Sequence, residues 1–153
     1  SKKIKNKKLK ILDLGCNQGR HIKYLYNRKF DNLYGVDIMK KAITVFKQNS
    51  SVKEKKHIKI RQDYIQRYLN KTKNDFFFAS YTFGATIELL HPSFDIVKEL
   101  IRVSRKYVFL YINENEHWYP RFYVFEFRRN NAKLIYKNKF GKMSFLVFEK
   151  NID

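Results

Sequence analysis

The segment ILDLGCNQGR, at residues 11–20, constrains the fold more than any other part of this sequence. Its apolar start is typical of a buried parallel strand, and we expect that strand to end at Gly15. Gly15 and Gly19 remove side chains where a ligand must approach the backbone, and Asn17 can adopt the left-handed conformation that glycine otherwise supplies. We therefore expect a strand that leads directly into a ligand-binding turn.

The rest of the chain alternates between strand and helix patterns, without internal repeats. We expect strands at 9–15, 32–38, 57–64, 74–83, 106–112, 132–139 and 143–150, and helices near 20–28, 39–46, 93–101 and 121–131. Ser93 is the expected N-cap of the third helix. Such alternation predicts an α/β fold whose sheet is mostly parallel. Only a short turn at Gly141 joins the last two strands, so the last strand is expected to be antiparallel.

Length and composition favour a single domain over residues 1–153, with residues 1–8 as a basic N-terminal tail. No stretch reaches the roughly 18 consecutive apolar residues of a membrane span, and no apolar signal-peptide core follows the basic start. The sequence therefore predicts a soluble, cytoplasmic protein without a membrane span. Cys16 is the sole cysteine, which excludes an internal disulfide or an all-cysteine metal site; no metal is expected.

The net charge of +19 and the isoelectric point near 10.0 leave two interpretations open. Clustered Lys and Arg side chains bind nucleic acid by displacing counterions from phosphates, so RNA is one candidate partner. The chain is also rich in Lys, Asn, Ile, Phe and Tyr together, which is typical of a compositional bias across a whole proteome.

The turn after the first strand favours a cationic ligand over a dinucleotide. A G-x-G-x-x-G fingerprint that starts at Gly15 requires glycine at the positions of Asn17 and Arg20. Asp13, two residues before the turn, repels a pyrophosphate but attracts an ammonium or sulfonium group. The residues therefore predict a cationic ligand with an amino acid head group.

The pattern D-x-G-x-x-x-G at residues 13–19 resembles motif I of the class I S-adenosylmethionine-dependent methyltransferases, in the variant with Asn for the middle glycine. The resemblance covers nearly the whole chain and implies a Rossmann-like, doubly wound sheet of seven strands. It also implies S-adenosylmethionine as the cofactor and S-adenosylhomocysteine as the product. The cofactor contacts that it implies in this turn are Asp13, Gly15, Cys16, Asn17 and Gly19.

Four further residues lie at the ends of the second and third strands, and the resemblance implies a cofactor contact for each. Asp37 resembles the acid that accepts hydrogen bonds from the two ribose hydroxyls, and Ile38 packs on the adenine. Asp63 resembles the residue that meets the adenine amino group, with Tyr64 beside the ring. Two alternatives stay open: Asp37 as a helix N-cap, and Asp63 as a solvated loop residue. We expect the fourth strand to end near Ser80, whose backbone passes beneath the methionine part.

The loop at residues 113–123 is the candidate acceptor side, because it follows the fifth strand and is unusually rich in functional side chains. Glu114, His117 and Tyr119 are the candidate catalytic residues, as hydrogen-bond partners or a base for the acceptor. The alternative for the aromatic side chains, among them Trp118, is that they pack the following helix onto the sheet.

A small molecule is the favoured acceptor. The segment SYTFG at residues 80–84 lacks the Asp/Asn-Pro-Pro-aromatic motif of enzymes that methylate adenine or cytosine amino groups. Methylation of cytosine at C5 needs a nucleophilic cysteine, and the sole cysteine, Cys16, lies in the cofactor turn. Methylation of ribose or guanine in RNA remains an alternative, as does a catalytically silent cofactor-binding partner subunit. The first strand starts about ten residues into the sequence, so we expect an open cleft or one that an oligomer or partner chain covers.

Overall fold

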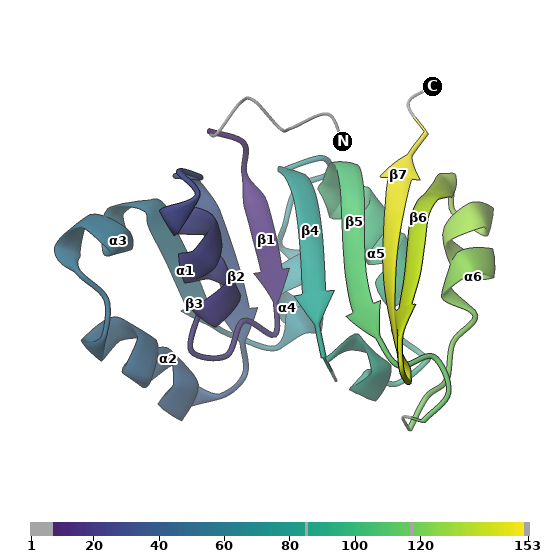
Figure 1. Ribbon diagram of the computed structural model, residues 1–153, viewed down its shortest axis with the longest axis horizontal. Helices are drawn as coiled ribbons and strands as arrows, with labels where there is room; N and C mark the ends of the chain where they lie inside the picture. Colours follow the sequence, from purple (N-terminus) through teal and green to yellow (C-terminus); the bar gives the residue numbers. More distant parts are fainter. Residues whose placement is uncertain (1–7, 85, 117, 152–153) are drawn as a thin grey trace.

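Seven strands form the central sheet of the protein. The computed structural model describes residues 8–84, 86–116 and 118–151. The strands are β1 (Ile11–Leu14), β2 (Leu33–Asp37), β3 (Ile58–Gln62), β4 (Phe77–Phe83), β5 (Ser104–Ile112), β6 (Ala132–Phe140) and β7 (Met143–Lys150). They lie in the order β3-β2-β1-β4-β5-β7-β6 (Figure 1). Strands β1 to β5 pair in parallel, whereas β7 pairs antiparallel with both β5 and β6, which confirms the predicted sheet.

Helices cover both faces of this sheet, as a doubly wound fold requires. The helices α1 (Arg20–Asn27), α2 (Lys40–Gln48) and α3 (Val52–His57) lie with β1 to β3 on one face. On the other face lie α4 (Ile65–Asn70), α5 (Ile96–Val103) and α6 (Tyr123–Arg129), and a single 3-10 turn, η1 (Ile87–Leu89), follows β4 (Figure 1). Across the described ranges, no helix has the length and apolar character needed to cross a membrane.

Two separate hydrophobic cores hold the layers together, one on each face of the sheet. The core beneath α4 to α6 is the larger, and α5 supplies Ile96, Val97 and Leu100 to it at helical spacing. Phe127 of α6 stacks on Phe148 of β7 there, with ring centroids 3.9 Å apart. The other core takes Ile22 from α1 and residues of α2, packed on β1, β2 and β3. The sheet is therefore anchored from both sides near β1.

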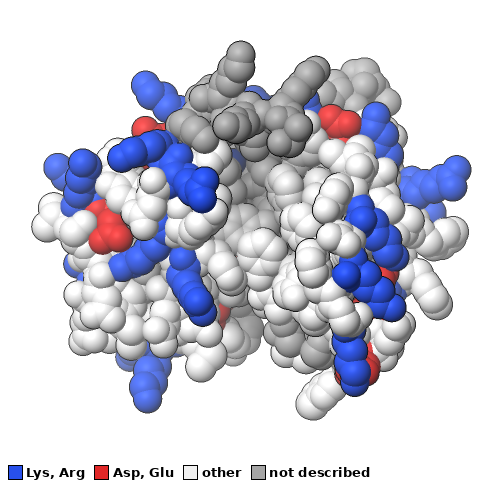
Figure 2. Space-filling view, in the orientation of Figure 1, with Lys and Arg blue, Asp and Glu red and all other residues white. Residues whose placement is uncertain are grey.

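The α1 face of the sheet is only half covered. No helix of the described chain lies over β4, β5 and β7 on this side (Figure 1). Aromatic side chains project from these strands instead: the ring centroid of Phe83 lies 6.0 Å from that of Tyr111 and 6.4 Å from that of Phe145. Figure 2, in the same orientation, shows a hollow down the middle whose described atoms are mostly from uncharged residues, with Lys and Arg side chains gathered on both flanks.

The sequence analysis missed α3 and α4. Helix α3 buries none of its residues, so it has no apolar periodicity to detect. Its signal is a capping box: the Ser51 hydroxyl accepts from the Glu54 N–H, and the Glu54 carboxylate accepts from the Ser51 N–H. Helix α4 has only six residues and buries only Leu69. Both helices are too short for a period-based prediction.

Two predicted boundaries were wrong. Ser93 does not cap α5: its N–H and hydroxyl both bond to Nδ1 of His91, and Asp95 caps the helix by accepting from the Lys98 N–H at 3.0 Å. Strand β4 ends at Phe83, as the predicted range 74–83 has it, so the placement of its carboxyl end near Ser80 was wrong. The reason is its parallel pairing with β5, which extends to Phe83 opposite Tyr111. The residues at the carboxyl end of β4 are therefore Phe83 and those that follow it.

Candidate functional site

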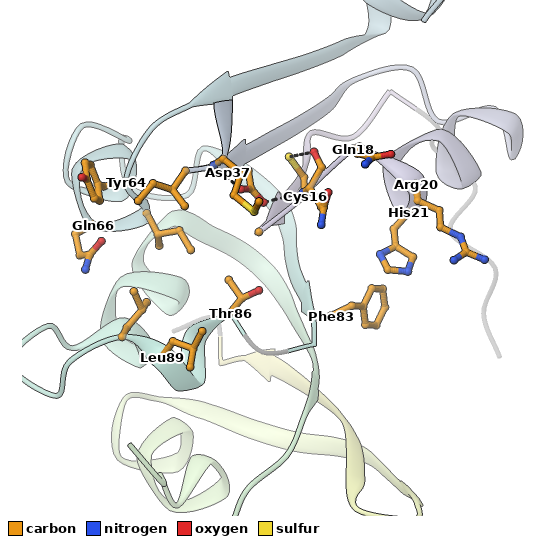
Figure 3. Close-up of a pocket in the computed structure, with 16 residues that line it drawn as sticks. Cys16, Gln18, Arg20, His21, Asp37, Tyr64, Gln66, Phe83, Thr86 and Leu89 are labelled. Carbon is orange, nitrogen blue, oxygen red and sulfur yellow. Dashed lines mark hydrogen bonds between the residues drawn. The ribbon is translucent and has the colours of Figure 1, made fainter. Parts of the chain in front are cut away.

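A cleft of about 760 Å³ lies at the carboxyl ends of β1, β2, β3 and β4, where ligands bind in open α/β sheets. We call it the cofactor cleft. In Figure 3, Tyr64 and Gln66 lie at one end of it, Asp37 and Cys16 near the middle, and His21 and Phe83 at the other end. The residues that line it are 15–18, 20, 21, 37–39, 64–66, 83, 86, 89 and 90.

In the turn after β1, Asn17 adopts the predicted left-handed conformation, and so do the two glycines. The φ angles are 73° at Gly15, 48° at Asn17 and 75° at Gly19. The N–H of Gly15 donates to the Val36 carbonyl at 2.9 Å, which joins the start of the turn to β2. A Cβ atom on Gly15 would lie 2.4 Å from the Thr86 hydroxyl oxygen. Gly15 therefore gives the cofactor cleft a wall of bare backbone.

The second glycine of the turn has a structural function that the sequence analysis did not foresee. Gly19 does not line the cofactor cleft. A Cβ atom there would lie 2.6 Å from the Phe46 ring, so the missing side chain lets α2 pack closely against the start of α1. The two glycines of the motif thus serve different purposes.

Asp37 is buried at the end of β2, 8% exposed, and faces the cofactor cleft. One carboxylate oxygen accepts from the N–H of Asn17 at 2.8 Å, and the other from the N–H of Met39 at 2.8 Å. The N-cap residue of α2 is Met39, and no side-chain bond caps that helix. Because each carboxylate oxygen has two lone-pair sites, both can accept one more hydrogen bond from a ligand.

Asp13 lies behind the turn, 2% exposed, and does not line the cleft. Burial raises the pKa of Asp13 to about 7; the Tyr81 hydroxyl, which donates to it at 3.0 Å, lowers the pKa, and the Asp37 charge raises it. Near neutral pH this carboxyl is therefore poised between its charged and neutral forms. A cation in the cleft would favour the charged form.

Cys16 and His21 line the cofactor cleft in uncharged forms. Burial raises the pKa of the Cys16 thiol well above its usual range, and Asp13 and Asp37 add to the effect, so the thiol is not a nucleophile. Partial burial and the Arg20 charge lower the pKa of His21. The sequence analysis missed His21, whose only signal is its place in the first turn of the helix after the glycine turn.

Of the two residues predicted at the end of β3, only Tyr64 lines the cofactor cleft, together with Ile38 from the end of β2. Both side chains are more than half exposed and supply flat, apolar surface. The Asp63 carboxylate instead accepts from the Arg67 side chain and from the N–H of Tyr64, and it borders a different hollow. Arg67 belongs to α4, the helix that the sequence analysis missed.

The remaining predicted site residues lie outside the cofactor cleft or outside the described ranges. Ser80 is fully buried, its hydroxyl 2.6 Å from that of Ser104. Glu114 accepts from the Ser144 hydroxyl at 3.0 Å and pairs with Lys137 across a separate hollow of about 190 Å³. Tyr119 packs edge-on against His91, with ring centroids 5.2 Å apart. His117 lies outside the described residues.

A buried polar cluster fixes the wall that faces Gly15. The Arg121 guanidinium donates to the Ile87 carbonyl at 2.9 Å and to the Leu90 carbonyl at 2.7 Å. The Glu88 carboxylate, 1% exposed, accepts from the N–H of Thr86 and from that of Asn113. These bonds hold the segment after β4 in place, so that Leu90 and its neighbours line the cleft.

A glycine turn after the first strand, an acid after the second and the strand order 3-2-1-4-5-7-6 define a Rossmann-like nucleotide-binding fold. A family model described as a methyltransferase domain matches residues 5–144. The chain therefore belongs to the methyltransferase domain family, whose members are enzymes that use S-adenosylmethionine. No curated protein matches it in sequence.

Solved structures share the fold at low sequence identity. An S-adenosylmethionine-dependent methyltransferase from Mesorhizobium loti is 10% identical with a TM-score of 0.76, covering 94% of this chain and 91% of its own. The magnesium protoporphyrin IX methyltransferase of Synechocystis, solved with its cofactor, is 12% identical with a TM-score of 0.73, covering 94% and 71%. A cyclase is 7% identical with a TM-score of 0.80, covering 95% and 76%. The fold alone thus does not define the reaction.

Proposed function

We propose that this methyltransferase acts on a small-molecule acceptor. The observation that carries the proposal is the surface next to the cofactor cleft. His21 and Phe83 also line a second hollow, and no Lys or Arg of the described chain lines that hollow. An RNA acceptor carries a charge on every phosphate, and its binding groove is expected to be basic. The uncharged hollow favours a small acceptor without phosphate groups.

The residues of the cofactor cleft fit S-adenosylmethionine. The Asp37 oxygens have lone pairs left for two ribose hydroxyls, the bare backbone at Gly15 permits close approach, and Ile38 and Tyr64 offer apolar surface for an adenine ring. Asp13, behind the turn, favours a positively charged ligand. Within our proposal Gly15, Asp37, Ile38 and Tyr64 contact the cofactor, whereas Asp13, Gly19, Asp63 and Ser80 lie outside the cleft and support its shape.

When bound, S-adenosylmethionine supplies a methyl group on a sulfonium, which is already activated for attack by a nucleophile. The protein then needs to hold an acceptor in line, about 3 Å from the carbon, and to exclude competing water. A general base is needed only if the acceptor must lose a proton. The function of this chain is thus mainly to orient two ligands.

Two measurements test this proposal. Calorimetric titration with S-adenosylhomocysteine should show binding to the folded protein. Absence of binding would contradict the proposal that the cofactor cleft holds S-adenosylmethionine. Incubation with labelled S-adenosylmethionine and a protein-free, RNA-free metabolite extract should then label a small product. Transfer to total RNA but not to the extract would reverse the choice of acceptor. Binding of S-adenosylhomocysteine without transfer to either would support the alternative of a silent partner subunit.

RNA remains the second candidate because of the net charge of +19 and the Lys and Arg side chains on both flanks of the hollow (Figure 2). If these flanks bind RNA, its affinity should fall with salt, with a log-log slope of about −3 or steeper. Methyl transfer should fall in parallel. A shallow slope, or turnover that does not follow RNA occupancy, would indicate that the net positive charge reflects a compositional bias and not RNA binding.

A further inference from the structure

A second hollow, of about 770 Å³, continues the cofactor cleft over the half-covered face of the sheet. We call it the aromatic cleft. It is built from α1, β4, β5, β6 and β7, and it shares His21 and Phe83 with the cofactor cleft. The residues that line it are His21, Tyr24, Leu25, Tyr81, Phe83, Gly84, Tyr111, Phe140 and Phe145.

The lining of the aromatic cleft favours a flat, uncharged ligand. None of the described residues that line it has a charged side chain. The buried hydroxyl of Tyr81 already bonds to Asp13, which leaves mostly ring surface to meet a ligand. Phe140 and Tyr24, 54% and 57% exposed, stand at the rim. An exposed aromatic surface of this kind marks a binding site, and aromatic rings pack on one another edge-on or in offset stacks.

His21 stands where the two clefts meet. Its ring lies edge-on to that of Phe83, with centroids 4.8 Å apart, and Figure 3 shows both rings at the same end of the cofactor cleft. The lowered pKa of His21 leaves the imidazole unprotonated at neutral pH, so one ring nitrogen is free to take a proton. Two described side chains line both clefts, His21 and Phe83, and of these His21 is the base.

We propose that the aromatic cleft binds the methyl acceptor, a planar aromatic molecule with a hydroxyl group, and that His21 takes the hydroxyl proton during methyl transfer. This inference rests on the proposed function. The acceptor oxygen forms a bond to the methyl carbon while the bond between that carbon and sulfur breaks. The electron pair of the broken bond stays on sulfur. The hydroxyl proton moves to the free imidazole nitrogen of His21 and leaves to water after product release.

Binding in the aromatic cleft is tested with 2-naphthol as the probe and without the cofactor. The change is Phe140→Ala, which removes an exposed ring and spares the cores, and the matched control is Phe125→Ala on α6, 60% exposed and outside the cleft. Naphthol fluorescence should report binding that Phe140→Ala weakens by about fivefold and that Phe125→Ala leaves unchanged. Absence of naphthol binding, or equal binding by both variants, would overturn the proposal.

The same proteins separate this inference from the proposed function. Phe140 does not line the cofactor cleft, so the affinity for S-adenosylhomocysteine should be equal in Phe140→Ala and the unmodified protein. If S-adenosylhomocysteine binds and naphthol does not, the inference fails while the proposed function stands. If S-adenosylhomocysteine does not bind at all, the proposed function itself fails.

The function of His21 is tested by comparing two acceptors in single-turnover methylation. One is 2-naphthol, which must lose a proton; the other is an aromatic thiol that is already ionised at the assay pH. His21→Gln should slow naphthol methylation by about a hundredfold and thiol methylation by less than about threefold. Naphthol affinity, measured by fluorescence, should stay within about threefold. Equal slowing of both acceptors would show that His21 only shapes the site.

Discussion

The Asp37 carboxylate accepts a hydrogen bond from the backbone N–H of Asn17 at 2.8 Å, across twenty residues of sequence. Asn17 is held at a φ of 48°, a conformation that few residues other than glycine adopt readily. The end of β2 therefore stabilises the turn after β1 directly. A single acid sets the shape of the turn and, with its remaining lone pairs, offers acceptors to a ligand.

We expect Asp37→Ala to weaken binding of S-adenosylhomocysteine by about 1–3 kcal/mol, because charge-assisted hydrogen bonds to the ligand are lost. The Asn17 and Met39 N–H groups also lose their acceptor, so the melting temperature should fall as well. Calorimetric titration and thermal unfolding of the same sample measure the two effects.

Asp63→Ala is the matched control for this substitution. The Asp63 carboxylate is hydrogen-bonded to Arg67 and lies outside the cofactor cleft. We therefore expect the variant's affinity for S-adenosylhomocysteine to stay within about threefold of that of the unmodified protein, roughly 0.7 kcal/mol. A loss as large as that of Asp37→Ala would support the adenine contact that the family resemblance implies for Asp63.

Asp13 should make stability fall as pH rises. In the folded protein this carboxyl has a pKa of about 7, whereas in the unfolded chain the same carboxyl loses its proton near pH 4. The folded state binds more protons between these values, so the free energy of unfolding should drop by on the order of 3 kcal/mol from pH 4 to pH 8. Asp13→Asn should remove that part of the drop. Urea unfolding at both pH values checks this, and equal drops in both proteins would contradict it.

Gly19→Ala should destabilise the fold by about 2–4 kcal/mol, because alanine is strained at a φ of 75° and its Cβ would press on the Phe46 ring. Gly141→Ala is the control: its φ is 59°, yet open space surrounds the position, so only about 1 kcal/mol should be lost. Urea unfolding measures both. Equal losses would show that close packing of Gly19 on Phe46 is unimportant.

Glu114→Gln tests the sequence-based interpretation of the loop after β5. The structure ties this side chain to Ser144 and Lys137, so we expect turnover on the true acceptor and cofactor affinity to change by less than about threefold. Loss of the partly exposed ion pair should cost less than about 1 kcal/mol of stability. A large fall in turnover with unchanged cofactor affinity would instead establish Glu114 as an acceptor contact.

The sheet and half of the site could be predicted because they depend on local patterns. Apolar runs that end in Gly15 and Asp37 determine where two strands stop, and parallel pairing brings those ends together. Ser80 bonds to Ser104 of β5, and that contact depends on tertiary placement. Asp63 pairs with Arg67 only four residues later, a local contact that could not be predicted because the short helix α4 was missed. His21 was missed because one histidine on a short helix has no pattern to mark it.

The anchor that Arg121 makes has a mechanical consequence. Its guanidinium spans from the chain just before α6 to the carbonyls of Ile87 and Leu90, more than thirty residues earlier. A displacement of the chain at Arg121 would therefore strain the segment that faces Gly15 across the cofactor cleft. The width of the cofactor cleft is thus tied to the position of Arg121.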